Sequence, residues 1–183
     1  MRSAPRWGFH QLSAAIATRI VADAEVQPGE LVLDVGAGEG ALTGPLVAAG
    51  AQVVAIELHH GRLRRLRQRF PSRQVRAIHA DASDLRLPRR PFRVIANPPF
   101  AVTTALLRRL LAPGSRLVAA DLVVPRHTLH RWMSDRAPGR QRWRHDYKLG
   151  VGRRVPRRQF QPPAPTDCVV LTIRRRSNGR SAG

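Results

Sequence analysis

The stretch Leu31-Val-Leu-Asp-Val-Gly36-Ala-Gly38-Glu-Gly40 decides the fold of this chain. A short apolar run enters a turn that has glycine at alternate positions, and an apolar segment with helical spacing follows at 41–49. Glycine lets a backbone turn sharply off a strand and come close to a ligand that a side chain would keep away. The stretch therefore predicts a strand, a ligand-binding turn and a helix.

Taken alone, the glycine turn does not identify its ligand. Gly36, Gly38 and Ala41 also fit the fingerprint of dinucleotide-binding proteins, in which a pyrophosphate rests on a helix N-terminus. Glu39 argues against a phosphate, because it would place a second negative charge beside it. A tight turn that binds nothing is the other alternative.

Outward from this turn, predicted strands and helices alternate along the chain. Such alternation predicts an α/β fold with a parallel sheet that is covered on both faces. Two late strand candidates, 147–151 and 168–173, have no helix between them, so we expect an antiparallel finish at one sheet edge. The other predicted strands are 31–35, 52–56, 75–79, 92–96 and 116–124, and the predicted helices are 12–21, 41–49, 61–70, 102–111 and 127–133.

Two acidic residues follow the next predicted strands. Glu57 lies about twenty residues beyond the glycines, where a carboxylate accepts both hydroxyls of a ribose. NAD and S-adenosylmethionine both carry such a ribose. Asp81 follows the third strand, from which it can accept the amino group of an adenine; the alternative is a helix N-cap.

The tetrapeptide Asn97-Pro-Pro-Phe100 ends the fourth of these strands. Two prolines stiffen the loop, so its carbonyl groups point in set directions. The exocyclic amine of a base is a poor nucleophile, because its lone pair is delocalised into the ring. The Asn97 side-chain oxygen and a proline carbonyl can accept both of its hydrogens and aim that lone pair at a methyl sulfonium, while Phe100 stacks on the base. The motif predicts methyl transfer to an amino nitrogen.

With these motifs, the chain resembles the class I S-adenosylmethionine-dependent methyltransferases that act on amino nitrogens. It is most similar to the rRNA adenine N6-methyltransferases, the erythromycin-resistance (Erm) and dimethyladenosine transferase family. The resemblance runs from about 7 to 173, and its most specific support is the segment Val155-Pro-Arg-Arg-Gln-Phe160-Gln-Pro-Pro-Ala-Pro-Thr-Asp-Cys-Val-Val-Leu171. It implies a Rossmann-like fold with a mostly parallel seven-stranded sheet and an antiparallel edge strand.

The resemblance also assigns roles to individual residues. Phe160 is expected to be the second aromatic of the target pocket, opposite Phe100. His10 stands where the family usually has an asparagine that touches the cofactor, and Phe100 stands where it usually has tyrosine. The expected catalytic residues are Asn97, Pro98, Phe100 and Phe160; the expected cofactor-binding residues are His10, Leu12, Gly36, Gly38, Glu57, Asp81, Ala82 and Asn97.

The composition adds a large positive charge. The 183 residues include 32 Lys plus Arg against 12 Asp plus Glu, a net charge of +20, and Lys148 is the one lysine. From residue 125 onward the net charge is +12, against +8 before it. Arginine pairs well with phosphate, so we expect this part to bind RNA; the alternative is an arginine-rich solvated surface. The expected RNA-binding residues are Arg140, Arg142, Arg144, Arg153, Arg154, Arg157, Arg158, Arg174, Arg175 and Arg176.

One catalytic domain is expected at 1–173, followed by a flexible basic tail at 174–183 and no C-terminal helical RNA-binding domain. The single Cys168 excludes an intrachain disulfide and a cysteine-rich metal site, and no metal is expected. No stretch suits a signal peptide or a membrane span, so we expect a cytoplasmic protein. We also expect it to be a monomer.

The resemblance implies methylation of 23S rRNA and resistance to macrolide, lincosamide and streptogramin antibiotics. One alternative is a small-subunit rRNA dimethyltransferase. Others are an adenine methyltransferase acting on DNA or tRNA, and, from another class, a catalytically idle RNA-binding scaffold.

Overall fold

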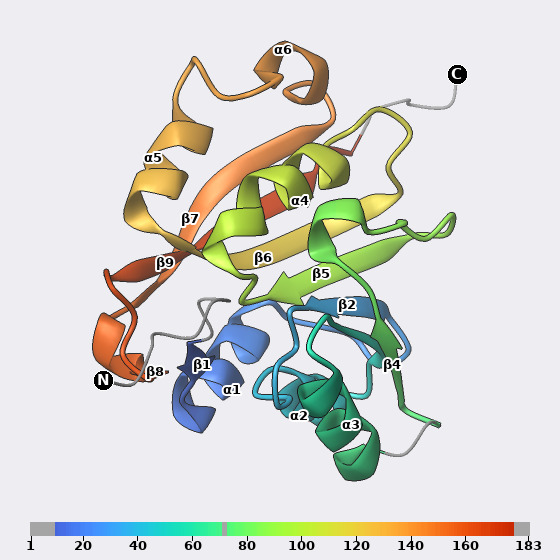
Figure 1. Cartoon of the computed structure of the whole chain (residues 1–183). Coiled ribbons are helices and arrows are strands. Elements are labelled where there is room, and N and C mark those ends of the chain that lie inside the picture. The colour runs from blue at the N-terminus through green and yellow to red at the C-terminus, as the bar shows by residue number, and fades with distance from the viewer. Residues whose placement is uncertain (1–9, 71–72, 178–183) are drawn as a thin grey trace.

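A computed structural model describes residues 10–70 and 73–177 of the chain. Seven strands form one sheet in the order β4-β3-β2-β5-β6-β9-β7 (Figure 1). Strand β9 pairs antiparallel with both β6 and β7, and all the other pairings are parallel. The seven-stranded, mostly parallel sheet is confirmed, although the antiparallel strand lies one place in from the edge. The strands are β2 (Leu31–Val35), β3 (Gln52–Glu57), β4 (Val75–His79), β5 (Phe92–Ala96), β6 (Leu117–Pro125), β7 (Tyr147–Val155) and β9 (Cys168–Arg175).

Helices cover both faces of this sheet. Side chains alternate between the faces along each strand: Val94 of β5 joins one cluster of buried residues, and the next residue, Ile95, joins the other. Leu106 of α4 and Trp132 of α5 pack in the first cluster, and Ile20 of α1 packs in the second. The helices are α1 (Ala14–Asp23), α2 (Thr43–Ala48), α3 (His60–Arg69), α4 (Thr103–Leu110), α5 (Arg126–Met133) and α6 (Arg140–Trp143), with short 3-10 turns at Ala82–Asp84, Phe100–Val102 and Arg157–Gln159.

A small second sheet lies beside the main one, and the sequence pattern does not predict it. Strand β1 (Gln11–Leu12) pairs antiparallel with β8 (Phe160–Gln161). The prediction of a helix from residue 12 is wrong at its start, because Ser13 caps α1: its hydroxyl accepts a hydrogen bond from the Ile16 amide. Leu12 is therefore held in β1, with its side chain 3% exposed.

The last strand extends further than predicted. Arg174 and Arg175 belong to β9, so the expected boundary between domain and tail at 173 is wrong. The Arg174 guanidinium donates to the carboxylate of buried Asp121 at 2.8 Å, which ties this end of β9 to β6. Residues 178–183 of the expected tail lie outside the described residues. In the described part of the chain, none of the helices has the length and apolar character that crossing a membrane requires.

Candidate active site

The glycine turn after β2 is locked onto two neighbouring segments. Gly36 and Gly38 have φ of +75° and +59°, a region that favours glycine. The amides of Gly36 and Ala37 both donate to the carbonyl oxygen of Ile56 on β3, at 2.8 and 3.0 Å. A Cβ at Gly36 would lie 2.9 Å from Cδ of Pro99, so glycine is what lets the Asn-Pro-Pro loop pack against the turn.

Glu57 holds the far side of the same turn. Its carboxylate is 5% exposed at the end of β3 and accepts hydrogen bonds from the Gly38 amide at 2.8 Å and the His59 amide at 2.7 Å. A carboxylate oxygen has more than one lone-pair site, so each can accept a ribose hydroxyl as well. The position therefore suits the predicted role.

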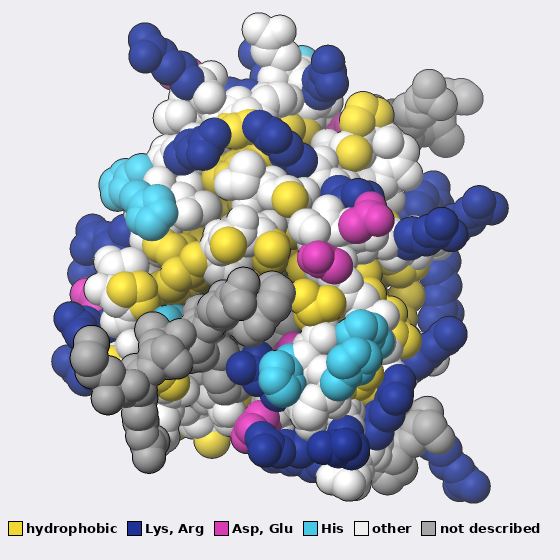
Figure 2. Space-filling view, in the orientation of Figure 1, with side chains coloured by type: hydrophobic (Ala, Val, Ile, Leu, Met, Phe, Trp, Pro, Cys, Tyr) yellow, Lys and Arg dark blue, Asp and Glu magenta, His cyan; other side chains and the backbone are white. Residues whose placement is uncertain are grey.

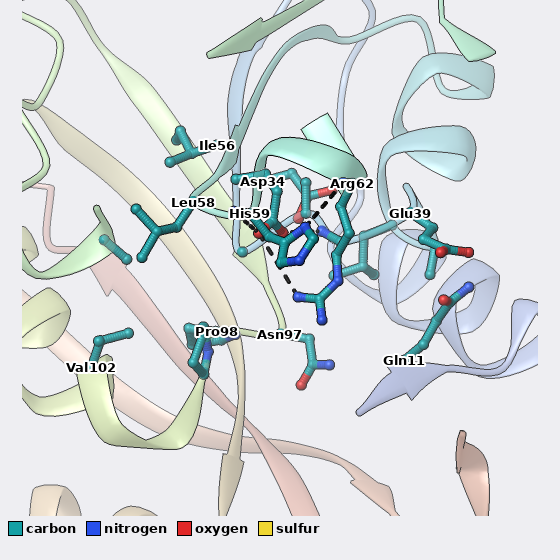
Figure 3. A pocket seen from close by; sticks show the side chains of 18 of the residues that line it. Gln11, Asp34, Glu39, Ile56, Leu58, His59, Arg62, Asn97, Pro98 and Val102 are labelled. Atoms are coloured by element: carbon teal, nitrogen blue, oxygen red, sulfur yellow. Dashed lines mark hydrogen bonds and ion pairs between the residues drawn. The ribbon is translucent and has the colours of Figure 1, made fainter. Parts of the chain in front are cut away.

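A histidine and an arginine at the start of α3 complete this side, and sequence reasoning missed both. The imidazole Nδ1 of His59 accepts from the amides of Gly61 at 3.1 Å and Arg62 at 3.4 Å, which caps the helix. The Arg62 guanidinium lies 3.9 Å from the Glu57 carboxylate, and Figure 3 shows both His59 and Arg62 at the pocket. An imidazole at an N-cap has no clear signature in a single sequence.

Asp34 is a further pocket residue that the predictions left out. It lies near the carboxyl end of β2, where the residue is 1% exposed and its carboxylate accepts from the Thr43 hydroxyl at 2.6 Å. Burial is the main reason why the pKa of Asp34 rises to about 7. The available signal was an acidic residue inside an otherwise apolar strand.

The loop after β5 presents Asn97 to the pocket. The Asn97 side-chain nitrogen donates to the backbone oxygen of His10 at 2.7 Å. That oxygen can only accept, so the bond settles which end of the amide is which and leaves the Asn97 oxygen as the acceptor. The amide of Val102 and the hydroxyl of Thr103 both donate to the Pro99 oxygen, at 3.0 and 3.3 Å, so the loop is held from within.

Asp81 makes the contacts of a cap and also faces the pocket. Its carboxylate accepts from the amide and the hydroxyl of Ser83, both at 2.8 Å, and these bonds lower the pKa of Asp81. It is therefore ionised at neutral pH and remains an acceptor. Its predicted contact with an adenine amino group stays a prediction.

These elements enclose a cavity of about 560 Å³ at the carboxyl ends of the parallel strands (Figure 3). That volume lies in the range of pockets that take nucleotide-sized ligands. The glycine turn that a Cβ would obstruct and the buried carboxylate of Glu57 fit the ribose end of a nucleoside cofactor. The predicted residues that line the cavity are His10, Leu12, Gly36, Gly38, Glu57, Asp81, Ala82, Asn97, Pro98 and Phe100.

Phe160 is the predicted site residue that the structure places elsewhere. It pairs with Leu12 between β8 and β1, is 3% exposed and packs in the core cluster under α1. It does not contribute to the cavity lining. The structure therefore keeps the Phe160 ring out of the cavity lining, and its expected place opposite Phe100 in the target pocket stays a prediction.

The predicted RNA-binding arginines divide into two groups, which lie at opposite ends of the strands of the sheet. Val155 at the end of β7 and Pro125 at the end of β6 both pair with Cys168, so residues 153–158 lie at the carboxyl edge with the cavity. Tyr147, at the start of β7, pairs with Arg175, which puts that end at the opposite edge. The first group, the cavity-edge arginines, is Arg153, Arg154, Arg157 and Arg158; the second, the far-edge arginines, is Arg140, Arg142, Arg144, Arg174, Arg175 and Arg176.

Several members of the two groups are already engaged within the protein. Arg153 makes two hydrogen bonds to the Asp23 carboxylate, at 2.6 and 2.8 Å. Arg174 bonds to Asp121, and Arg175 donates to the Leu117 oxygen at 2.8 Å. Arg154, Arg157 and Arg158 have exposed side chains. Trp132 and Trp143, which stand in the sequence among these arginines, are buried and pack on each other at a ring-centroid distance of 6.4 Å.

Comparison with known proteins matches the sequence of this chain to one family. The sequence profile described as ribosomal RNA adenine dimethylase matches residues 6–180. Ribosomal RNA small subunit methyltransferase A of Thermosynechococcus vestitus is 37% identical over 188 residues, covering 95% of this chain and 70% of the relative. Mycinamicin-resistance protein MyrB of Micromonospora griseorubida is 32% identical, covering 88% of this chain and 52% of the relative.

The solved structure of the 23S rRNA methyltransferase ErmE has the same fold. It superposes with a TM-score of 0.80 at 24% identity, covering 92% of this chain and 70% of that one. The chain thus spans between about half and 70% of the length of the relatives that it matches.

Proposed function

We propose that this chain, which belongs to the ribosomal RNA adenine dimethylase family, transfers a methyl group from S-adenosylmethionine to the exocyclic amine of an adenine in ribosomal RNA. The observation that carries the proposal is the orientation of Asn97. Its amide nitrogen is held by the His10 backbone oxygen, so its own oxygen is kept as an acceptor in the cavity. An idle scaffold has no need of that arrangement.

The residues around Asn97 divide the work of the reaction. The Asn97 oxygen and the Pro98 carbonyl accept the two hydrogens of the adenine amine, which favours a pyramidal nitrogen with an available lone pair. Phe100 stacks on the base and keeps that nitrogen in line with the methyl group. S-adenosylmethionine, when bound, supplies the methyl on a positively charged sulfur.

The other side of the cavity is proposed to hold the cofactor. Glu57 accepts the ribose hydroxyls, Asp81 accepts the adenine amino group of the cofactor, and Gly36 and Gly38 allow the backbone to approach it. Leu12 and Ala82 close the site around it. Support comes from the convergence of these residues on one cavity from three successive strand ends.

For the RNA, we propose 23S rRNA and resistance to macrolide-type antibiotics, which the relative named as a mycinamicin-resistance protein supports. Small-subunit rRNA is the second candidate, because the Thermosynechococcus vestitus relative is named a small-subunit methyltransferase and is 37% identical. Methylating deproteinised rRNA with labelled cofactor and separating the large and small RNAs distinguishes the two. Label in the small-subunit RNA alone would contradict the 23S proposal.

We predict that Asn97→Ala lowers methyl transfer by at least about a hundredfold, since it removes an acceptor from the reacting amine. The measurement is label incorporated into rRNA under single-turnover conditions. Gln68→Ala is the matched control, because it deletes an amide from an exposed position on α3 outside the cavity lining. Equal activity of Asn97→Ala and Gln68→Ala would contradict the proposed role of Asn97.

A further inference from the structure

Phe100 lines the cavity with an aromatic ring that can stack on a base, and the His10 ring faces it. Phe100 is the one Phe, Tyr or Trp among the described residues that line the cavity. The His10 imidazole stacks on it, with ring centroids 6.1 Å apart and an angle of 23° between the planes. Phe160, which sequence reasoning placed opposite Phe100, is buried in the core. Among the described residues, the ring that stacks on Phe100 is that of His10.

We propose that His10 provides the second face of the target-base site, so that the adenine enters between the imidazole and the Phe100 ring. The inference rests on the proposed function for the place of the base, next to Asn97. A flat base needs about 3.5 Å to the ring on each side, so a sandwich separates the two ring centroids by roughly 7 Å. The centroids now lie 6.1 Å apart. The two rings must therefore separate for the base to enter between them.

Two hydrogen bonds hold His10 in the position that this role requires. Its Nδ1 lies 3.0 Å from the backbone oxygen of Pro162. Because a carbonyl oxygen only accepts, Nδ1 carries the hydrogen, and the bond orients the ring plane. The backbone oxygen of His10 accepts from the Asn97 side chain at 2.7 Å. One residue thus aligns both the stacking surface and the amide that receives the adenine amine.

This assignment moves the His10 side chain from the cofactor to the substrate. The family resemblance makes the residue at this position a cofactor contact, but here the ring is directed onto Phe100, at the end of the cavity formed by the Asn-Pro-Pro loop. The antiparallel pairing of Gln11 with Gln161 fixes this arrangement, because it brings the segments that carry His10 and Pro162 together.

The test compares His10→Ala with His10→Phe in the full chain. Both variants keep the backbone oxygen that holds Asn97, and both lose the bond to Pro162, so they differ in whether a ring faces Phe100. The probe is a short unstructured RNA with a single 2-aminopurine, whose fluorescence falls when it stacks on an aromatic ring. Cofactor affinity is measured by calorimetry on the same samples, and methyl transfer to rRNA is measured alongside.

We expect His10→Ala to lose most of the quenching and about tenfold or more of kcat/KM for RNA, with unchanged cofactor affinity. His10→Phe should restore both the quenching and the rate. Unchanged quenching in His10→Ala, or a loss of cofactor affinity that His10→Phe does not restore, would overturn the inference. If the wild type quenches through His10 but transfers no methyl, the base site stands and the proposed reaction fails.

Discussion

Gly36 is the single residue on which the glycine turn and the Asn-Pro-Pro loop both depend. We predict that Gly36→Ala lowers the free energy of unfolding by more than the roughly 1–2 kcal/mol of left-handed strain and abolishes cofactor binding, because its Cβ would lie 2.9 Å from Pro99. Gly29→Ala is the control: its φ is +83°, but a Cβ there meets no atom within 4 Å. Urea unfolding and calorimetric cofactor titration measure both effects. Equal losses for the two variants would contradict the role of the Pro99 contact.

Asp34 is a residue whose charge state changes near neutral pH. Burial raises its pKa to about 7, against an ordinary value of 3.8, so the folded protein holds a proton there more tightly than the unfolded chain. Its contribution to the free energy of unfolding therefore falls as pH rises from about 4 to about 7. In Asp34→Asn, which keeps an oxygen to accept from Thr43, this decline is expected to disappear. Urea unfolding of both proteins across this pH range measures the difference. If the free energy of unfolding changes with pH in the same way in both proteins, the raised pKa of Asp34 is contradicted.

At the scale of elements, the pairing of β1 with β8 determines what Phe160 does. We predict that Phe160→Leu lowers the free energy of unfolding by about 1 kcal/mol and leaves methyl transfer within about threefold, because it conserves much of the core volume. Phe160→Ala is expected to lower it by about 3–5 kcal/mol. The measurements are denaturant unfolding and label transfer. If the Phe160→Leu protein folds but its methyl transfer falls tenfold, the result would show that the Phe160 ring contributes to the target-base site.

The same two elements mark the limit of sequence reasoning. Strands such as β2 and β5 were predictable, because their apolar runs and the turns that end them are local signals. The residues expected on the cofactor side were predictable as well, because the carboxyl ends of parallel strands meet at one edge of the sheet. A two-residue strand has no periodicity, so the pattern predicts Leu12 of β1 as the start of a helix. Phe160 is expected in the pocket because of the family resemblance, not because of a local signal. His59 and Arg62 could not be predicted as pocket residues, because their place there depends on how the start of α3 packs beside Glu57.

At the scale of the whole molecule, the net charge of +20 is spread widely, and Lys and Arg side chains border the molecule on several sides (Figure 2). We propose that the cavity-edge arginines hold the RNA, because residues 157–162 adjoin β1: the Ser13 amide donates to the Gln159 oxygen at 2.8 Å. The far-edge arginines include Arg175 and Arg176, whose guanidinium groups donate to backbone oxygens.

We predict that changing Arg154, Arg157 and Arg158 to glutamine weakens RNA binding. The negative slope of log affinity against log salt concentration should become less steep by about 2–3. The matched control changes Arg140, Arg142 and Arg144, which removes the same charge from the far edge and is expected to leave the slope nearly unchanged. Filter binding of rRNA at several salt concentrations measures both. Equal loss from the two triple variants would show that the charge acts as a whole and not through the cavity edge.

The position of β9 between β6 and β7 has a consequence for how the protein is made. A ribosome synthesises both neighbours before residues 168–175, and β7 pairs with no other strand among the described residues. Until β9 emerges, the edge of β6 and the whole of β7 lack their hydrogen-bonding partner, and such open edges invite association with other chains. Closure of the sheet is therefore a late event that joins segments more than forty residues apart in the sequence, from Leu122 to Leu171. We therefore expect nascent chains that stall before residue 168 to expose these strand edges and to aggregate more readily than the finished protein.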